Sequence, residues 1–63
     1  MSLQKNLRRL RKKRKLSQKR VGYFNGMTRS TYANYENGDA EPNISTLVKL
    51  SKFFEVTVDG LIK

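Results

Sequence analysis

The sequence predicts an all-α fold of five short helices, in a single domain that spans residues 1–63. Apolar residues recur three, four and seven positions apart in successive segments, which is the spacing of one face of a helix. A Ser, Thr or Asn precedes these segments and can cap them. No segment alternates between apolar and polar residues as a half-buried strand would. At 63 residues the chain has no room for a second core, so we expect one domain.

The first helix is predicted over residues 3–14. Leu3, Leu7 and Leu10 share one face of this segment, and Ser2 is its predicted cap. Its last turn is entirely basic, which suits the negative end of the helix dipole.

The next two helices are separated by a turn at Gly26. Ser17 is the predicted cap of the second helix, which should end near Asn25, with Gly26 in the left-handed conformation. Thr28 is the predicted cap of the third helix, which "NG" closes at Gly38. The two helices would therefore be joined by a very short turn.

The last two helices follow the loop "DAEPN", which holds the only proline. Asn43 or Ser45 would cap the fourth helix, and Thr57 would cap the fifth. The apolar positions that these helices can bury are Leu47, Leu50, Phe54, Val58, Leu61 and Ile62.

The charge of the chain is strongly polarised. Fourteen Lys and Arg stand against five Asp and Glu, which gives a net charge of +9. Every acid lies beyond position 35, whereas ten cations lie within the first 20 positions: Lys5, Arg8, Arg9, Arg11, Lys12, Lys13, Arg14, Lys15, Lys19 and Arg20. A merely solvated helix face and an anionic membrane surface are two interpretations of this cluster. We favour a nucleic-acid partner, because the rest of the chain is patterned to bury the leucines of the first helix.

Composition argues against other classes of protein. With no Cys and no His, the usual ligands of a structural zinc site are missing, and we expect no metal, cofactor or small-molecule ligand. The five scattered carboxylates form no recognisable acid–base pair, so we expect no enzyme. No apolar run is long enough for a membrane span or a signal peptide, so we expect a cytoplasmic, nucleoid-associated protein.

The stretch "GMTRSTYANYENG" predicts a third helix with two different faces. At 100° per residue, Arg29, Ser30 and Asn34 fall on a small, polar side between roughly 0° and 140°. Tyr32 and Tyr35 fall on the opposite, aromatic side. The aromatic side can pack against a core, while the polar side offers directional hydrogen bonds to a partner. Together with the preceding helix and its tight turn, this segment predicts a helix-turn-helix.

From about Leu3 to Ile62 the sequence resembles the phage repressor and Cro, or XRE-type, family of DNA-binding domains. The resemblance rests on "LRKKRKLSQ", "GMTRSTYANYENG" and "EPNISTLVKLSKFFEVTVDGLI". It implies a five-helix, lambda-repressor-like DNA-binding domain in which the second and third helices form the helix-turn-helix. It also implies binding to operator DNA, usually as a dimer.

The resemblance implies a role for several single residues. The base-reading positions of the family match Arg29, Ser30 and Asn34. The side chains expected at the DNA backbone are Gln18, Lys19, Thr28, Thr31, Asn37 and Arg11, with Lys19 drawn from the basic cluster. Arg11 and Glu36 match a partly buried ion pair that joins the first and third helices.

Chemistry agrees with the base-reading positions, since Arg can bond guanine bidentately, Asn can bond adenine, and Ser accepts several bases. Some of the other residues also have plain structural explanations. Thr28 can serve only as a cap, Asn37 can shape the turn, and Glu36 can be purely structural.

Three positions depart from the family pattern. Asn25 stands where a buried Leu is usual, Gly22 where Ala is usual, and Lys15 where Gly often ends the first helix. We expect Lys15→Gly to stabilise the domain by roughly 0.5–1 kcal/mol if Lys15 has a positive φ, and Gly22→Ala to do the same if there is space for a methyl group. Phe24 could turn inward to replace the lost apolar contact, or Tyr23 and Phe24 could remain exposed and mark a protein interface.

Two functional hypotheses follow from these observations. The first is a sequence-specific regulator of transcription, a repressor of bacterial or phage origin that binds a double-stranded operator. The alternative is an antitoxin-type interaction protein that binds a protein partner and its own promoter. Because the chain ends just after the fifth helix, we expect no separate dimerisation domain. We expect instead a weak homodimer through Val58, Leu61 and Ile62.

Overall fold

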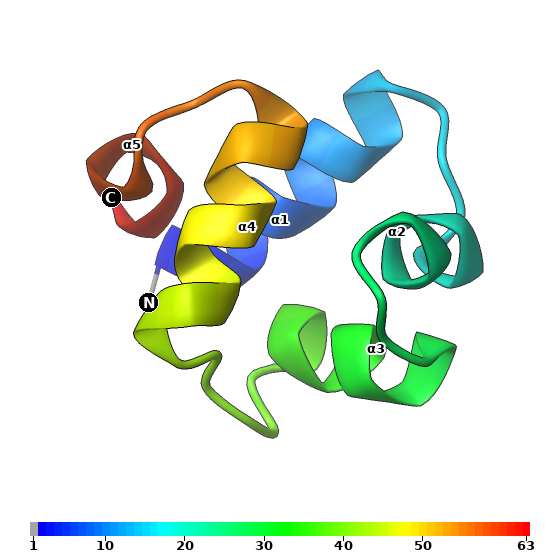
Figure 1. The fold of residues 1–63 in the computed structure, drawn as a ribbon. Coiled ribbons are helices and arrows are strands. Elements are labelled where there is room, and N and C mark those ends of the chain that lie inside the picture. Colours follow the sequence, from blue (N-terminus) through cyan, green and yellow to red (C-terminus); the bar gives the residue numbers. More distant parts are fainter. Residues whose placement is uncertain (1) are drawn as a thin grey trace.

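The computed structural model describes residues 2–63, with side chains from Leu3 onward, and confirms the all-α fold of five helices. The helices are α1 (Ser2–Lys13), α2 (Gln18–Phe24), α3 (Arg29–Asn37), α4 (Ile44–Phe54) and α5 (Val58–Ile62) (Figure 1). Within residues 2–63 there is no strand, and no helix is long and apolar enough to cross a membrane. The predicted cap at Ser2 lies outside the described side chains.

Each helix from α2 to α5 begins after a side chain that caps it. The side-chain oxygen accepts a hydrogen bond from a backbone N–H in the first turn, which would otherwise have no partner. The capping residues are Ser17, Thr28, Asn43 and Thr57. All four were predicted, with Asn43 taking the place that the sequence left open between Asn43 and Ser45.

Left-handed backbone ends several of the helices. Gly26 has a φ of 70°, as predicted, and Lys15 has a φ of 58°, as the family pattern implied. Gly38, which closes α3, has a φ of 81°. Glu55, which caps α4, also has a φ of 58°, which no residue pattern predicted. Because a residue with a Cβ is strained in this region, each of these two non-glycine positions costs the fold on the order of 1 kcal/mol.

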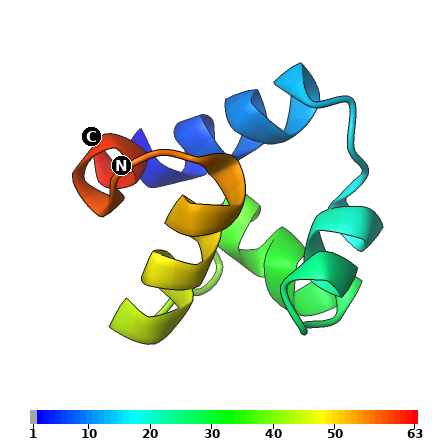
Figure 2. The same cartoon turned by 45° about the horizontal axis from the view of Figure 1, so that its top comes forward.

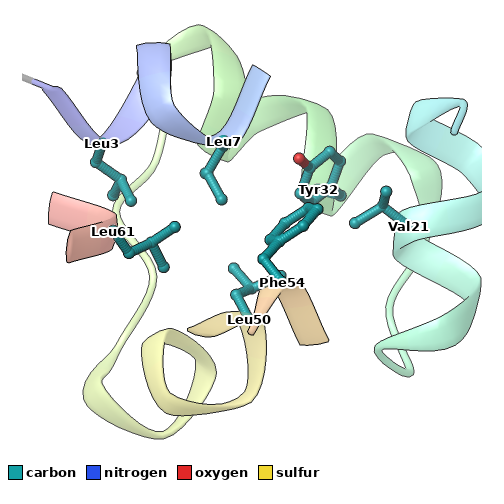
Figure 3. Packing of buried hydrophobic residues seen from close by; sticks show 7 residues of the cluster. All are labelled: Leu3, Leu7, Val21, Tyr32, Leu50, Phe54 and Leu61. Carbon is teal, nitrogen blue, oxygen red and sulfur yellow. The ribbon is translucent and has the colours of Figure 1, made fainter. Parts of the chain in front are cut away.

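All five helices contribute to one apolar core, shown in Figure 3. Its buried members are Leu3, Leu7, Val21, Tyr32, Leu50, Phe54 and Leu61. In Figure 3 the side chains of Leu50 and Phe54 on α4 point up between α1, α3 and α5, so side chains of α4 fill the centre of the core.

The two ends of the molecule are built differently. Figure 2 shows α2 and α3 together at one end, whereas α5 lies at the other end beside the N-terminal half of α1. A hydrogen bond of 2.8 Å from the Asn6 side chain to the carbonyl oxygen of Leu61 ties α1 to α5. The helix pair α2–α3 is therefore free of α5 and can present its outer surface to a partner.

Candidate nucleic-acid interface

The α2–α3 pair is a tight unit whose turn is fixed by backbone contacts. The N–H of Met27 donates to the carbonyl oxygen of Gly22 over 2.9 Å, and Gly26 supplies the left-handed residue between the helices. A Cβ at Gly22 would lie only 3.0 Å from the carbonyl oxygens of both Met27 and Thr28. The space on which a stabilising Gly22→Ala exchange depended is therefore missing, and we expect this exchange to destabilise the domain instead.

The third helix has the two faces that the sequence predicted. Tyr32 and Glu36 are buried, with 0% and 1% of their surface exposed. The predicted base-reading side chains, Arg29, Ser30 and Asn34, are all exposed. They lie on the solvent-facing side of a helix whose opposite side packs against the rest of the domain.

The predicted backbone-contacting residues of α3 surround this open side. Thr28 caps the helix, and its hydroxyl donates to the Thr31 hydroxyl over 3.0 Å. Thr31 and Asn37 are exposed near the two ends of the helix. Contacts of these three residues with DNA stay a prediction.

The carboxylate of Glu36 joins three helices. The Nε and Nη2 atoms of Arg11 on α1 donate to its two oxygens over 2.6 and 3.1 Å, and the Gln18 amide of α2 donates over 3.3 Å. The predicted Arg11–Glu36 ion pair is thus present, with 14% of the Arg11 side chain exposed and none of the Glu36 side chain. Since Arg11 also donates to the carbonyl oxygen of Leu16, it fixes the start of α2 as well.

These contacts set the ionisation of the cluster. Burial opposes the charge on Glu36, but hydrogen bonds led by that of Arg11 outweigh it, and the pKa of the Glu36 carboxyl lies below its usual value. The same hydrogen bond raises the pKa of the Arg11 guanidinium. The enclosed Tyr32 hydroxyl forms no hydrogen bond of good geometry within the described residues, and burial raises its pKa. Arg11 and Glu36 therefore both stay ionised at neutral pH.

Gln18 and Arg8 have contacts that the sequence reasoning missed. Gln18 was assigned to a phosphate, and in this structure its amide nitrogen is also bonded to Glu36. Arg8 donates to the backbone carbonyl of Glu36 over 3.2 Å, near the end of α3. Its position three residues before Arg11, on the same face of α1, is the signal that could have revealed it.

The departures from the family pattern lie at the end of α2. Asn25 is buried, and its side-chain amide donates to the carbonyl oxygen of Val21 over 2.7 Å, so the polar group is satisfied. Phe24 does not turn inward. It remains 53% exposed and stacks against Phe53 of α4, while Tyr23 is 75% exposed. Of the two alternatives, the structure has the exposed aromatic pair.

Comparison with known protein families matches residues 7–61 to the family described as helix-turn-helix. The chain belongs to the helix-turn-helix family. The prophage-derived, uncharacterized HTH-type transcriptional regulator YonR of Bacillus subtilis is 44% identical over 57 residues, covering 90% of this chain and 53% of YonR. The cryptic phage CTXphi transcriptional repressor RstR of Vibrio cholerae is 38% identical over 56 residues, covering 89% of this chain and 50% of RstR.

A solved structure supports the same assignment. The crystal structure of a transcriptional regulator from Listeria innocua matches with a TM-score of 0.87 and 29% identity, over 94% of this chain and 55% of that one. The chain spans about half the length of the curated relatives it matches, namely 53% of YonR and 50% of RstR.

The cationic surface of this helix-turn-helix chain is largely free of internal partners. Within residues 2–63, ion pairs engage only Arg8, Arg11 and Arg14 of the N-terminal cluster. Lys19, predicted to contact a phosphate, is exposed at the start of α2. Because like charges repel one another when unpaired, such a surface favours an anionic partner.

One predicted surface needs correction. Leu61 was expected to take part in a homodimer contact, but it is fully buried, because α5 docks against α1 and Leu61 completes the core there. Val58 and Ile62 are only half-buried. If α5 forms an interface, these two residues supply its apolar contacts.

Proposed function

We propose that this domain binds double-stranded DNA in a sequence-specific manner and regulates transcription as a repressor. The observation that supports this most directly is the division of α3. Arg29, Ser30 and Asn34 are free on its outer side, while Tyr32 and Glu36 hold it from behind. Such a helix can enter a major groove without giving up any contact that stabilises the fold.

Reading and gripping would be carried out by different residues. Arg29 would bond the two major-groove acceptors of a guanine, and Asn34 would read a neighbouring base one turn further along α3. Lys19 and the other free cations, together with the Gln18 amide, would hold the phosphates, which carry no sequence information. Neither a metal nor a cofactor has a role in this scheme.

Selection of bound sequences from random duplex DNA tests the proposal. We expect a defined motif for the wild-type chain, and a loss of preference at one position per half-site for Arg29→Ala, at a cost of about 1–3 kcal/mol. Lys19→Ala is the matched control. It should weaken binding to all sequences alike and lower the salt slope by about one unit. Uniform weakening by Arg29→Ala with an unchanged motif would demote Arg29 to a phosphate contact.

The domain would act as a weak homodimer that DNA tightens. Val58 and Ile62 on α5 would form the contact, and the two copies would read half-sites about one helical turn apart. A selected site that consists of a lone half-site bound by a monomer would contradict this.

An antitoxin-type interaction protein is the second candidate, and the exposure of Phe24 and Tyr23 favours it. Such a protein would bind a protein partner as well as its own promoter. Purification from the native cell separates the two functions, since only the antitoxin should emerge with a stoichiometric partner.

A further inference from the structure

Tyr23 lines two shallow hollows, one beside the start of α2 and one beside the turn that leads to α3. Ser17, Lys19 and Arg20 line the first with it, and we call this the basic hollow. The second, which we call the turn hollow, is lined by Tyr23 together with Gly26, Met27, Thr28 and Thr31. A single exposed aromatic side chain thus connects the cations of α2 with the first turn of α3.

The ring of Tyr23 has no role in the core. It is 75% exposed, and its one aromatic neighbour in residues 2–63 is Phe24, whose ring it meets edge-on at 5.6 Å between centroids. Phe24, by contrast, stacks on Phe53 of α4 and so belongs to the surface between α2 and α4. Tyr23 is therefore available to a partner without any cost to the packing.

The chemistry of the two hollows fits one strand of a DNA backbone. Lys19 and Arg20 form no ion pair within the described residues, and Thr28 and Thr31 add hydroxyl groups in the turn hollow. A nucleic-acid strand alternates anionic phosphates, which accept hydrogen bonds from Lys, Thr and Tyr, with sugars that present an apolar face. No acidic side chain lines either hollow.

We infer that Tyr23 contacts the sugar–phosphate backbone beside the N-terminal turn of α3, with its ring against a deoxyribose and its hydroxyl donating to a phosphate. This inference rests on the proposed DNA binding and adds a contact that orients α3 in the groove. It makes Tyr23 a positioning residue, since the phosphate contact carries no sequence information itself.

Two substitutions separate the ring from the hydroxyl. With mixed-sequence duplex DNA at low salt, Tyr23→Phe should bind about fivefold more weakly than wild type, the size of one hydrogen bond. Tyr23→Ala should bind at least about tenfold more weakly, because it also loses the ring. Since Tyr23 is neutral, neither variant should change the salt slope, whereas Lys19→Ala should lower it by about one unit. Equal affinity of Tyr23→Ala and wild type would overturn the inference, and equal affinity of Tyr23→Phe would overturn the hydroxyl contact.

A fluorescent probe adds a readout that a purely structural role would not move. The chain contains no Trp, so Tyr23→Trp introduces a single reporter, and Phe24→Trp on the neighbouring surface is its matched control. Saturating DNA should shield the probe at position 23 from acrylamide and leave the probe at position 24 unshielded. Equal shielding at both positions, or none at either, would overturn the inference, and the latter result would favour a protein partner for both aromatics.

Titration of the wild-type chain with DNA separates a failure of the proposed function from a failure of the Tyr23 contact. If the wild-type chain binds no duplex DNA at any salt concentration, the proposed function fails and the Tyr23 contact fails with it. If it binds DNA with the expected salt dependence while Tyr23→Ala binds equally well, only the Tyr23 contact fails.

Discussion

Replacing Gly22 with alanine adds one methyl group at the closest approach between α2 and the start of α3. The new Cβ would meet the carbonyl oxygens of Met27 and Thr28 at 3.0 Å and the carbonyl carbon of Thr28 at 3.2 Å. These are backbone atoms of a turn that a 2.9 Å hydrogen bond and the Thr28 cap hold in place, so they cannot move aside cheaply.

The magnitude follows from two opposing effects. Alanine in a helix gains about 0.5–1 kcal/mol over glycine, whereas forcing an extra methyl group into a packed contact costs about 1–3 kcal/mol. We expect the overpacking to win, and Gly22→Ala to lower the free energy of unfolding by about 1–2 kcal/mol.

Urea denaturation followed by circular dichroism measures this change. With a slope near 1 kcal/mol per molar, as for small domains, the midpoint should fall by about 1–2 M. Gly22→Ala should also weaken DNA binding, because separating α2 from α3 tilts the side chains that we propose read the bases. A midpoint at or above that of wild type would show that the turn relaxes freely and that the close contact does not constrain the helix pair.

Three further outcomes are expected. Lys15→Gly should raise the free energy of unfolding by roughly 0.5–1 kcal/mol, because glycine relieves the left-handed backbone at φ 58°; a lower urea midpoint would contradict this. Glu36→Gln should destabilise the domain at pH 7. Breaking a fully buried ion pair costs roughly 3–5 kcal/mol and breaking an exposed pair costs under about 1 kcal/mol, and we expect a loss between these two limits. Because the folded-state pKa of Glu36 is depressed, its contribution is complete above the usual pKa of a glutamate and is lost as the pH falls through the folded-state value, so wild type and variant should converge in acid; a constant difference in urea midpoint would sink the assignment. Val58→Glu should abolish cooperative binding to paired half-sites in gel-shift titrations while leaving the melting temperature near that of wild type, and unchanged cooperativity would remove α5 from the dimer contact.

Local signals explain why much of the fold could be predicted from the sequence. The ends of α3 depend on Thr28 and on Gly38, whose preferences act within one turn of the chain. The left-handed Glu55 carries no such local signal, because a residue with a Cβ is strained in this conformation and no glycine marks the position. Likewise, three apolar residues on a five-residue helix do not reveal which of them is buried, and only the docking of α5 against α1 and α4 selects Leu61.

The candidate site divides in the same way. Arg11 and Glu36 could be paired through the resemblance to a known family, whereas the contact at Gly22 joins residues of different helices through backbone atoms that no residue pattern encodes. Asn25 was conspicuous as a polar residue at an expected core position. How it is satisfied, through the carbonyl of Val21, became clear only from the fold.

The separation of roles along α3 bears on how readily a domain of this kind could change its target. Any variant of this nine-residue helix must keep an aromatic ring and a carboxylate on its inner side, because Tyr32 and Glu36 attach α3 to the core and to α1. Arg29, Ser30 and Asn34 carry no such obligation, because they are exposed and contribute no contact to the core. Substitutions at these three positions should therefore change the free energy of unfolding very little, within the roughly ±0.5 kcal/mol typical of surface sites. Descendants of one scaffold could thus diverge in the operator they recognise without passing through unfolded intermediates, and a library randomised at these positions alone should yield folded variants of new specificity.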